Sequence, residues 1–468
     1  IYAKRARFTT CNLDVPHYNF RTSKMKIINN KMGIAGPSFP EFEGVPMPIG
    51  IPFGIFPLNK GRHGGLLPPA FTASPDFGLG LEGLGYYFVL SENMDVTLRS
   101  NLYSFGGWNL NINSKYIKRY AYTGNLNITF QNTKSLNRST LSKDEFNSSR
   151  SFMINWSHSR DSRARPGTNF SANVNFGSSR FNQTLLNNPF LNFQNQLSSS
   201  VSYSKDWKGK YNLSVNLNHN QNNNLRLVNM NLPTVNFNVV TFYPFQPKEQ
   251  VGAGKWYKKI GIGYSGNFQN QISFYDTAFS VRRILDTIQY GAQHNIPITL
   301  SLPSLGPITI APSISYSERW YGQRNFRSWN NTTNKVDTVI QRGFYTARQM
   351  SFGLAANTRI FGTYKFKPTS NVIAIRHEIR PTISFNYQPD MNARYYYNLK
   401  VDTSNRTIRV SQFDGGIIGA YGEGAFGGIG FGIDNLLEMK TKNKQDTADK
   451  AGKKIKLIDG FGFNSNYN

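Results

Sequence analysis

The chain has 468 residues, too many for one ordinary domain, and only 39% of them are hydrophobic. A soluble protein of this length buries a large apolar core, whereas here the apolar residues are dispersed among Asn and Ser. Lys and Arg outnumber Asp and Glu by 53 to 26, and the formal charge of +27 indicates either a polyanionic partner or basic solvent-facing loops. The sequence has no run of about 18 apolar residues, which excludes a membrane-spanning helix.

The first 66 residues differ from the remainder. Segments 2–11 and 17–28 have the character of short strands, and a Pro/Gly-rich run follows at 36–69. Each proline removes a ladder donor, so this run is predicted to be a connector rather than a central strand. We expect a small β module over 1–66 and a larger β domain over 67–468. Because the chain begins mid-strand and ends in GFGFNSNYN without a clear closing strand, we also expect further sequence on both sides.

From about residue 76 the dominant pattern is alternation with a period of two. In GKYNLSVNLNHNQN, at 209–222, the apolar residues are Tyr211, Leu213, Val215 and Leu217, with Asn and Ser between them. The same pattern recurs at 107–113, 124–130, 168–179, 196–207, 256–268, 308–320, 347–361 and 378–389. It predicts strands with one apolar and one polar face. The polar segments 132–150, 218–227, 327–339 and 438–456 are predicted to be turns and long loops.

Aromatic residues gather near the ends of these segments, and the polar face is mostly uncharged. Ten-residue alternating strands with aromatic ends are typical of outer-membrane β-barrels, in which a closed sheet pairs every backbone group within lipid. The sequence therefore predicts an all-β fold, a large transmembrane antiparallel barrel with about 14–16 strands present. Tyr211, Leu213, Val215 and Leu217 are predicted to face lipid, while Asn and Ser line a wet lumen. A soluble extracellular β-rich binding protein is the alternative, since a second sheet could cover the apolar face instead.

Several segments together resemble the LptD family of lipopolysaccharide-assembly outer-membrane proteins. RARFTTCNLDVPHYNFRTSKMKII resembles the end of its periplasmic jelly-roll, and GVPMPIGIPFGIFP resembles its connector. GLGLEGLGYYFVLSENMDVTLRSNLYSFGGWNL, YIKRYAYTGNL, INWSHSRDSRARPGTNFSANVNFGSS, AIRHEIRPTISFNYQPD and FGIDNLLEMK resemble barrel segments of the family, in family order.

The resemblance implies a periplasmic jelly-roll module and a barrel in the cell outer membrane of a Gram-negative bacterium. It implies transport of lipopolysaccharide or lipooligosaccharide into the outer leaflet through a lateral gate and the lumen, with no enzymatic step and no cofactor. The implied partners are an LptE-type plug lipoprotein and an LptA-like periplasmic bridge protein. Another large barrel, a TonB-dependent transporter or a protein-secretion translocon, is the alternative function.

Candidate gate residues lie around the expected first barrel strand. They are Pro68, Pro69, Pro75, Phe77 and Leu79. Prolines that lack a donor weaken strand pairing, as a lateral opening requires, although they could equally well end a loop. Lumen amides suit sugar hydroxyls, and the excess Lys and Arg suits lipid phosphates.

The remaining chemical candidates are weak. Cys11 is the one cysteine in the sequence, and the resemblance makes it a disulfide candidate whose partner would lie outside these residues. Ser157, His158 and Asp161 are close in sequence, but a strand–turn segment places neighbours on opposite faces, so a catalytic triad is not expected. The six histidines show no ligand spacing, so no metal site is predicted. Basic residues among aromatics could suggest nucleic-acid binding, which would not explain the alternation.

Overall fold

The computed structural model describes residues 1–9, 11–29, 31–48, 50–58, 61–137, 145–182, 196–247, 255–275, 282, 286–442 and 453–468. Within them the fold is all-β, as predicted, and the few helical residues include the short 3-10 turns η2 (Trp256–Lys259) and η4 (Ala393–Tyr395). None of the described helical segments is long and apolar enough to cross a membrane. The chain divides into two compact units, residues Ile1–Ile117 with Asn125–Phe152 and residues Lys118–Gly124 with Met153–Asn468.

The first unit begins with a six-stranded sheet in the order β5-β4-β2-β3-β6, with β1 added to β2. The strands are β1 (Tyr2–Phe8), β2 (Tyr18–Ile28), β3 (Met32–Ala35), β4 (Ser38–Phe42), β5 (Val45–Pro46) and β6 (Gly54–Pro57). Phe8 packs against Phe20 and Phe56, with ring centroids 5.3 Å and 4.2 Å away.

Part of the predicted connector belongs to this sheet, which corrects the sequence-based expectation. β4, β5 and β6 all lie within 36–69. Pro40 is tolerated in β4 because its carbonyl accepts a hydrogen bond from Met47 at 2.8 Å, so the position of its missing donor faces the two-residue edge strand β5.

The longer strands of the first unit are antiparallel neighbours. They are β7 (Gly65–Leu67), β8 (Ala70–Ser74), β9 (Gly78–Ser91), β10 (Met94–Tyr103), β11 (Trp108–Lys118) and β12 (Tyr122–Leu136). β7 and β8 pair with the same edge of β9, and β10 pairs with the other edge.

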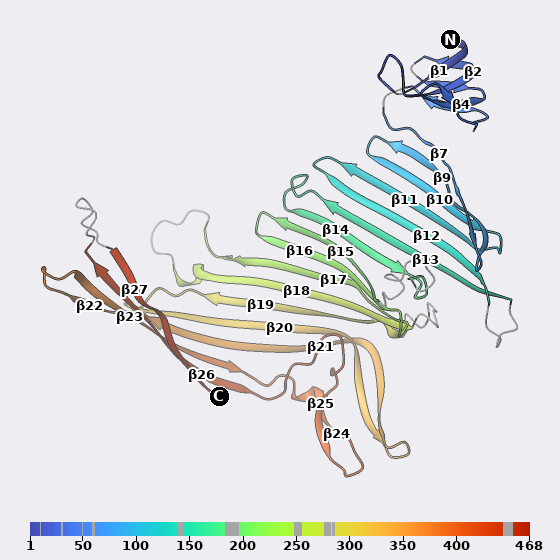
Figure 1. The fold of residues 1–468 in the computed structure, drawn as a ribbon. Helices are drawn as coiled ribbons and strands as arrows, with labels where there is room; N and C mark the ends of the chain where they lie inside the picture. The colour runs from blue at the N-terminus through green and yellow to red at the C-terminus, as the bar shows by residue number, and fades with distance from the viewer. Residues whose placement is uncertain are drawn as a thin grey trace. The chain divides into compact units, whose positions relative to one another are not determined.

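The second unit contains the greater part of the large sheet (Figure 1). Its strands are β13 (Phe146–Arg160), β14 (Thr168–Gly177), β15 (Gln196–Trp207), β16 (Tyr211–Asn222), β17 (Leu227–Phe242), β18 (Ile260–Tyr275), β19 (Gln289–Leu300), β20 (Ile308–Asn330), β21 (Lys335–Thr358), β22 (Ile360–Lys365), β23 (Val372–Gln388), β26 (Phe426–Thr441) and β27 (Lys453–Tyr467). A separate two-stranded sheet, β24 (Tyr396–Lys400) with β25 (Thr407–Ser411), lies between β23 and β26 in the chain.

The body of every segment with the alternating pattern lies in strands, so this prediction is confirmed apart from residues near the segment ends. The large sheet has 19 strand segments, more than the expected 14–16. The excess arises in part because β7 and β8 share one edge of β9, while β21 and β22 share one edge of β23.

Some boundaries differ from the sequence-based expectation. Residues 256–259 form the 3-10 turn η2, and the strand starts at Ile260. Residues 218–222 of the predicted loop 218–227 belong to β16, and the terminal GFGFNSNYN lies at the end of β27, which extends to Tyr467. Segments 138–144 and 443–452 of the predicted loops lie outside the described residues.

The polar segment 327–339, expected to be a loop, is instead a hairpin tip. β20 and β21 remain paired from Ile308↔Thr358 to Asn330↔Lys335, and a four-residue turn joins them. Figure 1 shows this hairpin continuing past the neighbouring strands, beside β24 and β25. Residues of this hairpin contact β24, as in the 2.7 Å hydrogen bond from the Arg327 N–H group to the Tyr397 hydroxyl, so they do not follow the alternation on which the prediction depended.

Glycines in β26 make room for side chains of its two neighbours. A Cβ atom at Gly432 would lie 2.4 Å from Asn464 Oδ1 and 2.7 Å from Thr382 Oγ1. At Gly430 it would lie 2.6 Å from Ser384 Oγ. The polar side chains of β23 and β27 therefore lie over β26, and a methyl group there would displace them.

Candidate functional site

The strands of the second unit present two unlike faces. One transverse row runs through Asn212, Asn238, Ser265, Asn295, Ser317 and Gln349, each residue paired with the next across β16 to β21. A row on the opposite face runs through Tyr203, Val215, Val235, Phe268, Ala292 and Trp320. We call these the amide face and the apolar face.

Side chains on the amide face hydrogen-bond across strands. The Ser315 and Ser317 hydroxyls donate to Asn295 Oδ1 at 3.0 Å and 2.9 Å. The Asn267 amide donates to Asn236 Oδ1 at 2.6 Å, and the Asn236 amide donates to the Ser214 hydroxyl at 3.3 Å. These contacts join β16 to β20 in one polar surface.

The predicted lipid-facing residues occupy the apolar face of β16. Leu213 pairs with Phe237, and Val215 pairs with Val235, while the ring of Tyr211 stacks on that of Phe237 with centroids 6.4 Å apart. Tyr211 is 45% exposed, and the other three residues are partly buried by their neighbours in the sheet. Neither buried apolar cluster of the described residues contains any of the four.

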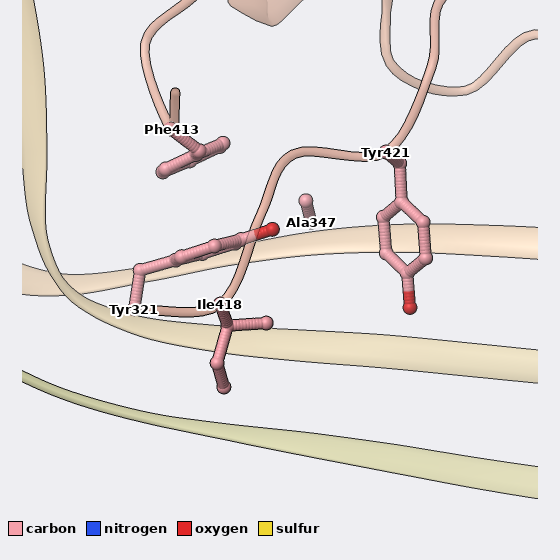
Figure 2. Close-up of a cluster of buried hydrophobic side chains, with 5 residues drawn as sticks. All are labelled: Tyr321, Ala347, Phe413, Ile418 and Tyr421. Carbon is pink, nitrogen blue, oxygen red and sulfur yellow. The ribbon is translucent and has the colours of Figure 1, made fainter. Parts of the chain in front are cut away.

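One of these clusters lies on the amide face, where residues 412–423 fold back over β19 to β21. We call this segment the strap. Figure 2 shows its Phe413, Ile418 and Tyr421 beside Tyr321 and Ala347 of the strands. The rings of Phe413 and Tyr321 stack with centroids 3.9 Å apart and an interplanar angle of 8°. Ala347 is 1% exposed, so the strap covers this part of the amide face completely.

The position of Gly291 confirms which face the strap covers. Gly291 alternates with Gln293 and Asn295, and a Cβ atom built on it would lie 2.8 Å from Ile418 Cδ1. The strap therefore lies on the side of β19 from which the amides project.

Polar contacts hold the two ends of the strap. At one end, Asn325 donates to the carbonyl oxygen of Asp414 at 2.9 Å, and Arg327 donates to the same oxygen at 3.1 Å. At the other end, Arg319 Nη1 donates to the carbonyl oxygen of Gly419 at 2.7 Å, and the Tyr321 hydroxyl donates to it at 3.1 Å.

Further contacts fix the strap from the side of β24. The Tyr396 hydroxyl donates to the carbonyl oxygen of Tyr421 at 2.6 Å, and the Tyr395 hydroxyl donates to that of Thr346 at 2.7 Å. Burial raises the pKa of the Tyr421 phenol, which therefore stays neutral at physiological pH. Backbone N–H donation by Asn392 and Ala393 lowers the pKa of Asp390, so the turn that leads into β24 keeps its charged cap.

A second irregular region lies along β9. Its pairing with β7 stops at Leu67↔Gly85, and its pairing with β8 starts at Ala70↔Glu82. Pro68 and Pro69 fill the gap, so Gly83 and Leu84 have no ladder partner on that edge.

The other edge of β9 is interrupted at the same level. The register with β10 shifts between Ser100 and Leu102. The Gly83 amide, at a φ of +79°, donates instead to the Asn101 side chain at 2.9 Å. The regular pairing of β9 is therefore interrupted on both of its edges near Gly83.

The other gate candidates occupy different environments. Pro75 is exposed in the turn after β8, and Leu79, which is 71% exposed, lies at the start of β9. Phe77 is buried against Tyr103, with ring centroids 5.6 Å apart, so it anchors this turn.

The remaining candidates from the sequence do not form a reactive cluster. Cys11 carries a free, partly buried thiol 3.9 Å from His17 Nδ1. Asp161 lies in the turn after β13 and binds the Arg163 side chain, while Ser157 and His158 alternate along the strand. The hydrogen bond from Arg163 lowers the pKa of Asp161 to about 2.

The strap was missed in the sequence analysis. It lies between β25, which ends at Ser411, and β26, which begins only at Phe426. The overlooked signal is the group of apolar residues in QFDGGIIGAY, which does not follow a period of two. Apolar residues in a glycine-rich loop must be covered by something else in the fold.

The comparison with known proteins decides the family. A family described as LptD protein matches residues 34–468. The chain belongs to the LptD family. The LPS-assembly protein LptD of Cupriavidus metallidurans is 33% identical over 115 residues, which cover 24% of this chain and 14% of that relative. The LPS-assembly proteins LptD of Haemophilus ducreyi and Idiomarina loihiensis are 32% and 34% identical, over 24% and 19% of this chain and 14% and 12% of theirs. The aligned segments thus cover less than a sixth of each of these relatives.

Proposed function

We propose that this protein assembles lipopolysaccharide or lipooligosaccharide at the outer membrane of a Gram-negative bacterium. Membership in the LptD family carries this proposal, together with relatives that bear the name LPS-assembly protein. The 1–66 module would face the periplasm, and the strands from residue 67 onward would form a barrel wall.

The two faces of the sheet suit the two ends of a glycolipid. The apolar face, with Tyr211 and Leu213 among its residues, would contact acyl chains of the membrane. The amide face would line a wet lumen, where Asn and Ser side chains can exchange hydrogen bonds with sugar hydroxyls. The glycan would travel along this face while the lipid leaves sideways.

The lateral opening would lie next to β9. Opposite Gly83 and Leu84 the ladder is interrupted, and neither Pro68 nor Pro69 has an N–H group with which to restore it. Such a strand edge separates at a lower free-energy cost than a continuous ladder, so these prolines support a gate at this position. Pro75, Phe77 and Leu79 would form the turn on which the gate hinges.

The strap lies on the proposed route of the glycan along the amide face. By strand parity, residues 412–423 lie at the same end of the sheet as the turns 223–226 and 331–334, opposite the turns 161–167 and 208–210. A glycan that moves along the amide face towards that end meets the strap, which would have to move aside. An LptE-type lipoprotein would occupy the lumen, and an LptA-like protein would deliver the glycolipid to the N-terminal module.

Depletion of the protein tests the proposal. We expect newly made glycolipid to accumulate in the inner membrane and periplasm, because its route to the surface is lost. Pulse labelling followed by membrane separation measures this distribution, and a strain that is depleted of an unrelated outer-membrane barrel is the control. Normal surface glycolipid after depletion would contradict the proposal. Extraction without detergent would contradict the membrane assignment itself.

A further inference from the structure

Two pockets on the amide face share one residue, Gln271. The first has a volume of about 320 Å³ and is lined by Asn173, Ser198, Ser199, Ser200, Asn218, His219, Asn220, Asn229, Asn231 and Gln271. The second has a volume of about 230 Å³, and Gln271, Ser273, Thr287 and Gln289 line it together with Gly415, Gly416 and Ile417 of the strap. The two pockets therefore form one continuous depression that ends beneath the strap.

A single transverse row forms the floor of this depression. Asn173 pairs with Ser200, and the row continues through Asn218, Asn231, Gln271 and Gln289, crossing β14 to β19. Neighbouring strands lie about 4.8 Å apart, so these side chains form an evenly spaced series of polar groups. Each carboxamide offers an acceptor and two donors at one position.

The lining is neutral, although the chain carries a formal charge of +27. None of the described residues that line either pocket is an Asp, Glu, Lys or Arg. An anionic group held here would lose its hydration without gaining a cation, which disfavours phosphate and carboxylate ligands. A ligand with many uncharged hydroxyl groups has no charge that must lose its hydration. Its hydroxyls can both donate and accept hydrogen bonds, as the amides can.

The size of each pocket suits one sugar ring. At ~30 Å³ per water molecule the pockets have room for roughly ten and roughly eight waters, on the order of the space that a pyranose ring and its solvent need. Because Gln271 borders both, its carboxamide can contact two consecutive rings. The backbone of Gly415 and Gly416, which carry no side chain, borders the second ring position.

We propose that these pockets are two contiguous subsites for uncharged pyranose units, with Gln271 between them. The inference rests on the proposed function, and it identifies which part of the glycolipid this region of the lumen contacts. Phosphorylated parts of the glycan bind elsewhere. Sugar hydroxyls exchange one set of hydrogen bonds for another on leaving water, so binding is weak and reversible, as passage of a chain requires.

The test uses the full-length protein in detergent, purified with any bound partner. The probe is the oligosaccharide released by mild acid from the cell's own surface glycolipid, both as isolated and after chemical removal of its phosphates. Saturation-transfer NMR measures its affinity. We expect Gln271→Leu to weaken binding about tenfold, and we expect the dephosphorylated probe to bind as well as the untreated probe.

The matched control is Gln246→Leu, which removes an exposed amide in the segment after β17, outside the amide face and both pockets, and leaves binding unchanged. Gln271→Asn, which keeps the carboxamide, restores most of the affinity and shows that the loss is not a folding defect. Equal binding by Gln271→Leu and the native protein overturns the inference, and so does loss of binding on dephosphorylation. If depletion of the protein still causes glycolipid to accumulate in the inner membrane and periplasm in either case, the assignment of the subsites is wrong and the transport function stands.

Discussion

The guanidinium group of Arg319 lies 4.0 Å from the ring centroid of Tyr421, and its Nη1 donates to the Gly419 carbonyl two residues before that ring. One β20 side chain thus holds the strap through a cation–π contact and a charge-assisted hydrogen bond. Since Tyr421 is 6% exposed, both interactions operate away from bulk water. Arg319 is therefore the side chain whose loss should release the strap most readily.

Arg319→Ala should loosen the strap while leaving the sheet intact. A partly desolvated cation–π contact contributes ~1–2 kcal/mol, and a hydrogen bond from a charged group contributes ~1.5–3 kcal/mol. Together they predict at least a tenfold increase in amide exchange over residues 412–423. Hydrogen exchange with mass spectrometry measures it. Arg406→Ala, which removes an exposed ion pair with Asp402, is the control and should leave strap exchange unchanged.

A disulfide across the strap tests whether the strap must move. In Gly291→Cys with Ile418→Cys, the new Cβ atom at 291 would lie 3.2 Å from the position of Ile418 Cγ1, which a sulfur atom can take. This spacing is compatible with a disulfide. We expect oxidation to block delivery of glycolipid to the surface and a reductant to restore it.

Each single cysteine variant serves as a control for the cross-link. Neither should respond to the reductant, because one new thiol at this position has no partner there. Undiminished surface delivery by the oxidised double variant would show that the strap can stay in place during transport.

The strand pattern was predictable because each long strand separates two unlike environments. Tyr211 to Leu217 alternate with amides, and the register follows that alternation across five or more strands. The projecting hairpin was not predictable in this way, because its contacts, such as that of the Arg327 N–H group with the Tyr397 hydroxyl, come from β24, which is far away in the chain. The strap was not predictable either, because its Phe413 and Ile418 are covered by residues about 100 positions away in the chain.

The ladder gap at β9 involves prolines that the sequence analysis singled out, and a gate at this position stays a prediction. Three prolines indicate weak pairing, and the structure places two of them opposite Gly83 and Leu84. The bulge on the other edge, at Asn101, could not be inferred, because no local pattern in β10 marks it. The burial of Phe77 could not be predicted from its sequence context, because its ring packs against that of Tyr103 in another strand.

Replacement of Pro68 and Pro69 by Thr should close the gap in the ladder. Successive N–H groups of a strand point to opposite sides, so one of the two restored groups can donate to β9 opposite Gly83 and Leu84, with a gain of about 1 kcal/mol. We expect slower amide exchange at 83–84 and slower surface delivery of glycolipid. Pro244→Thr, in the exposed turn after β17, is the control; faster delivery by the double variant would argue against a gate at this position.

Gly432→Ala should destabilise the β23–β26–β27 region. The added Cβ atom would lie within 2.7 Å of both Asn464 Oδ1 and Thr382 Oγ1, so both polar side chains must leave their positions. Overpacking of this kind costs ~1–3 kcal/mol. Thermal unfolding in detergent measures the loss of stability, because folded and heat-unfolded protein differ in their mobility on a gel. Gly427→Ala, where no atom lies within 4 Å, should behave like the native protein.

The turn after β13 should keep its structure to unusually low pH. The Arg163 side chain lowers the pKa of Asp161 to about 2, below the ~3.9 of an unfolded Asp. A carboxyl with a depressed folded-state pKa stabilises the fold fully above its unfolded pKa, and this contribution disappears as the pH falls through the folded value. The contribution of Asp161 should therefore be constant from pH 7 to about pH 5 and fade between about pH 4 and pH 2. Aspartate-selective ¹³C NMR measures the titration, Asp161→Asn assigns the signal, and a midpoint near 4 would show that the Arg163 contact is absent in solution.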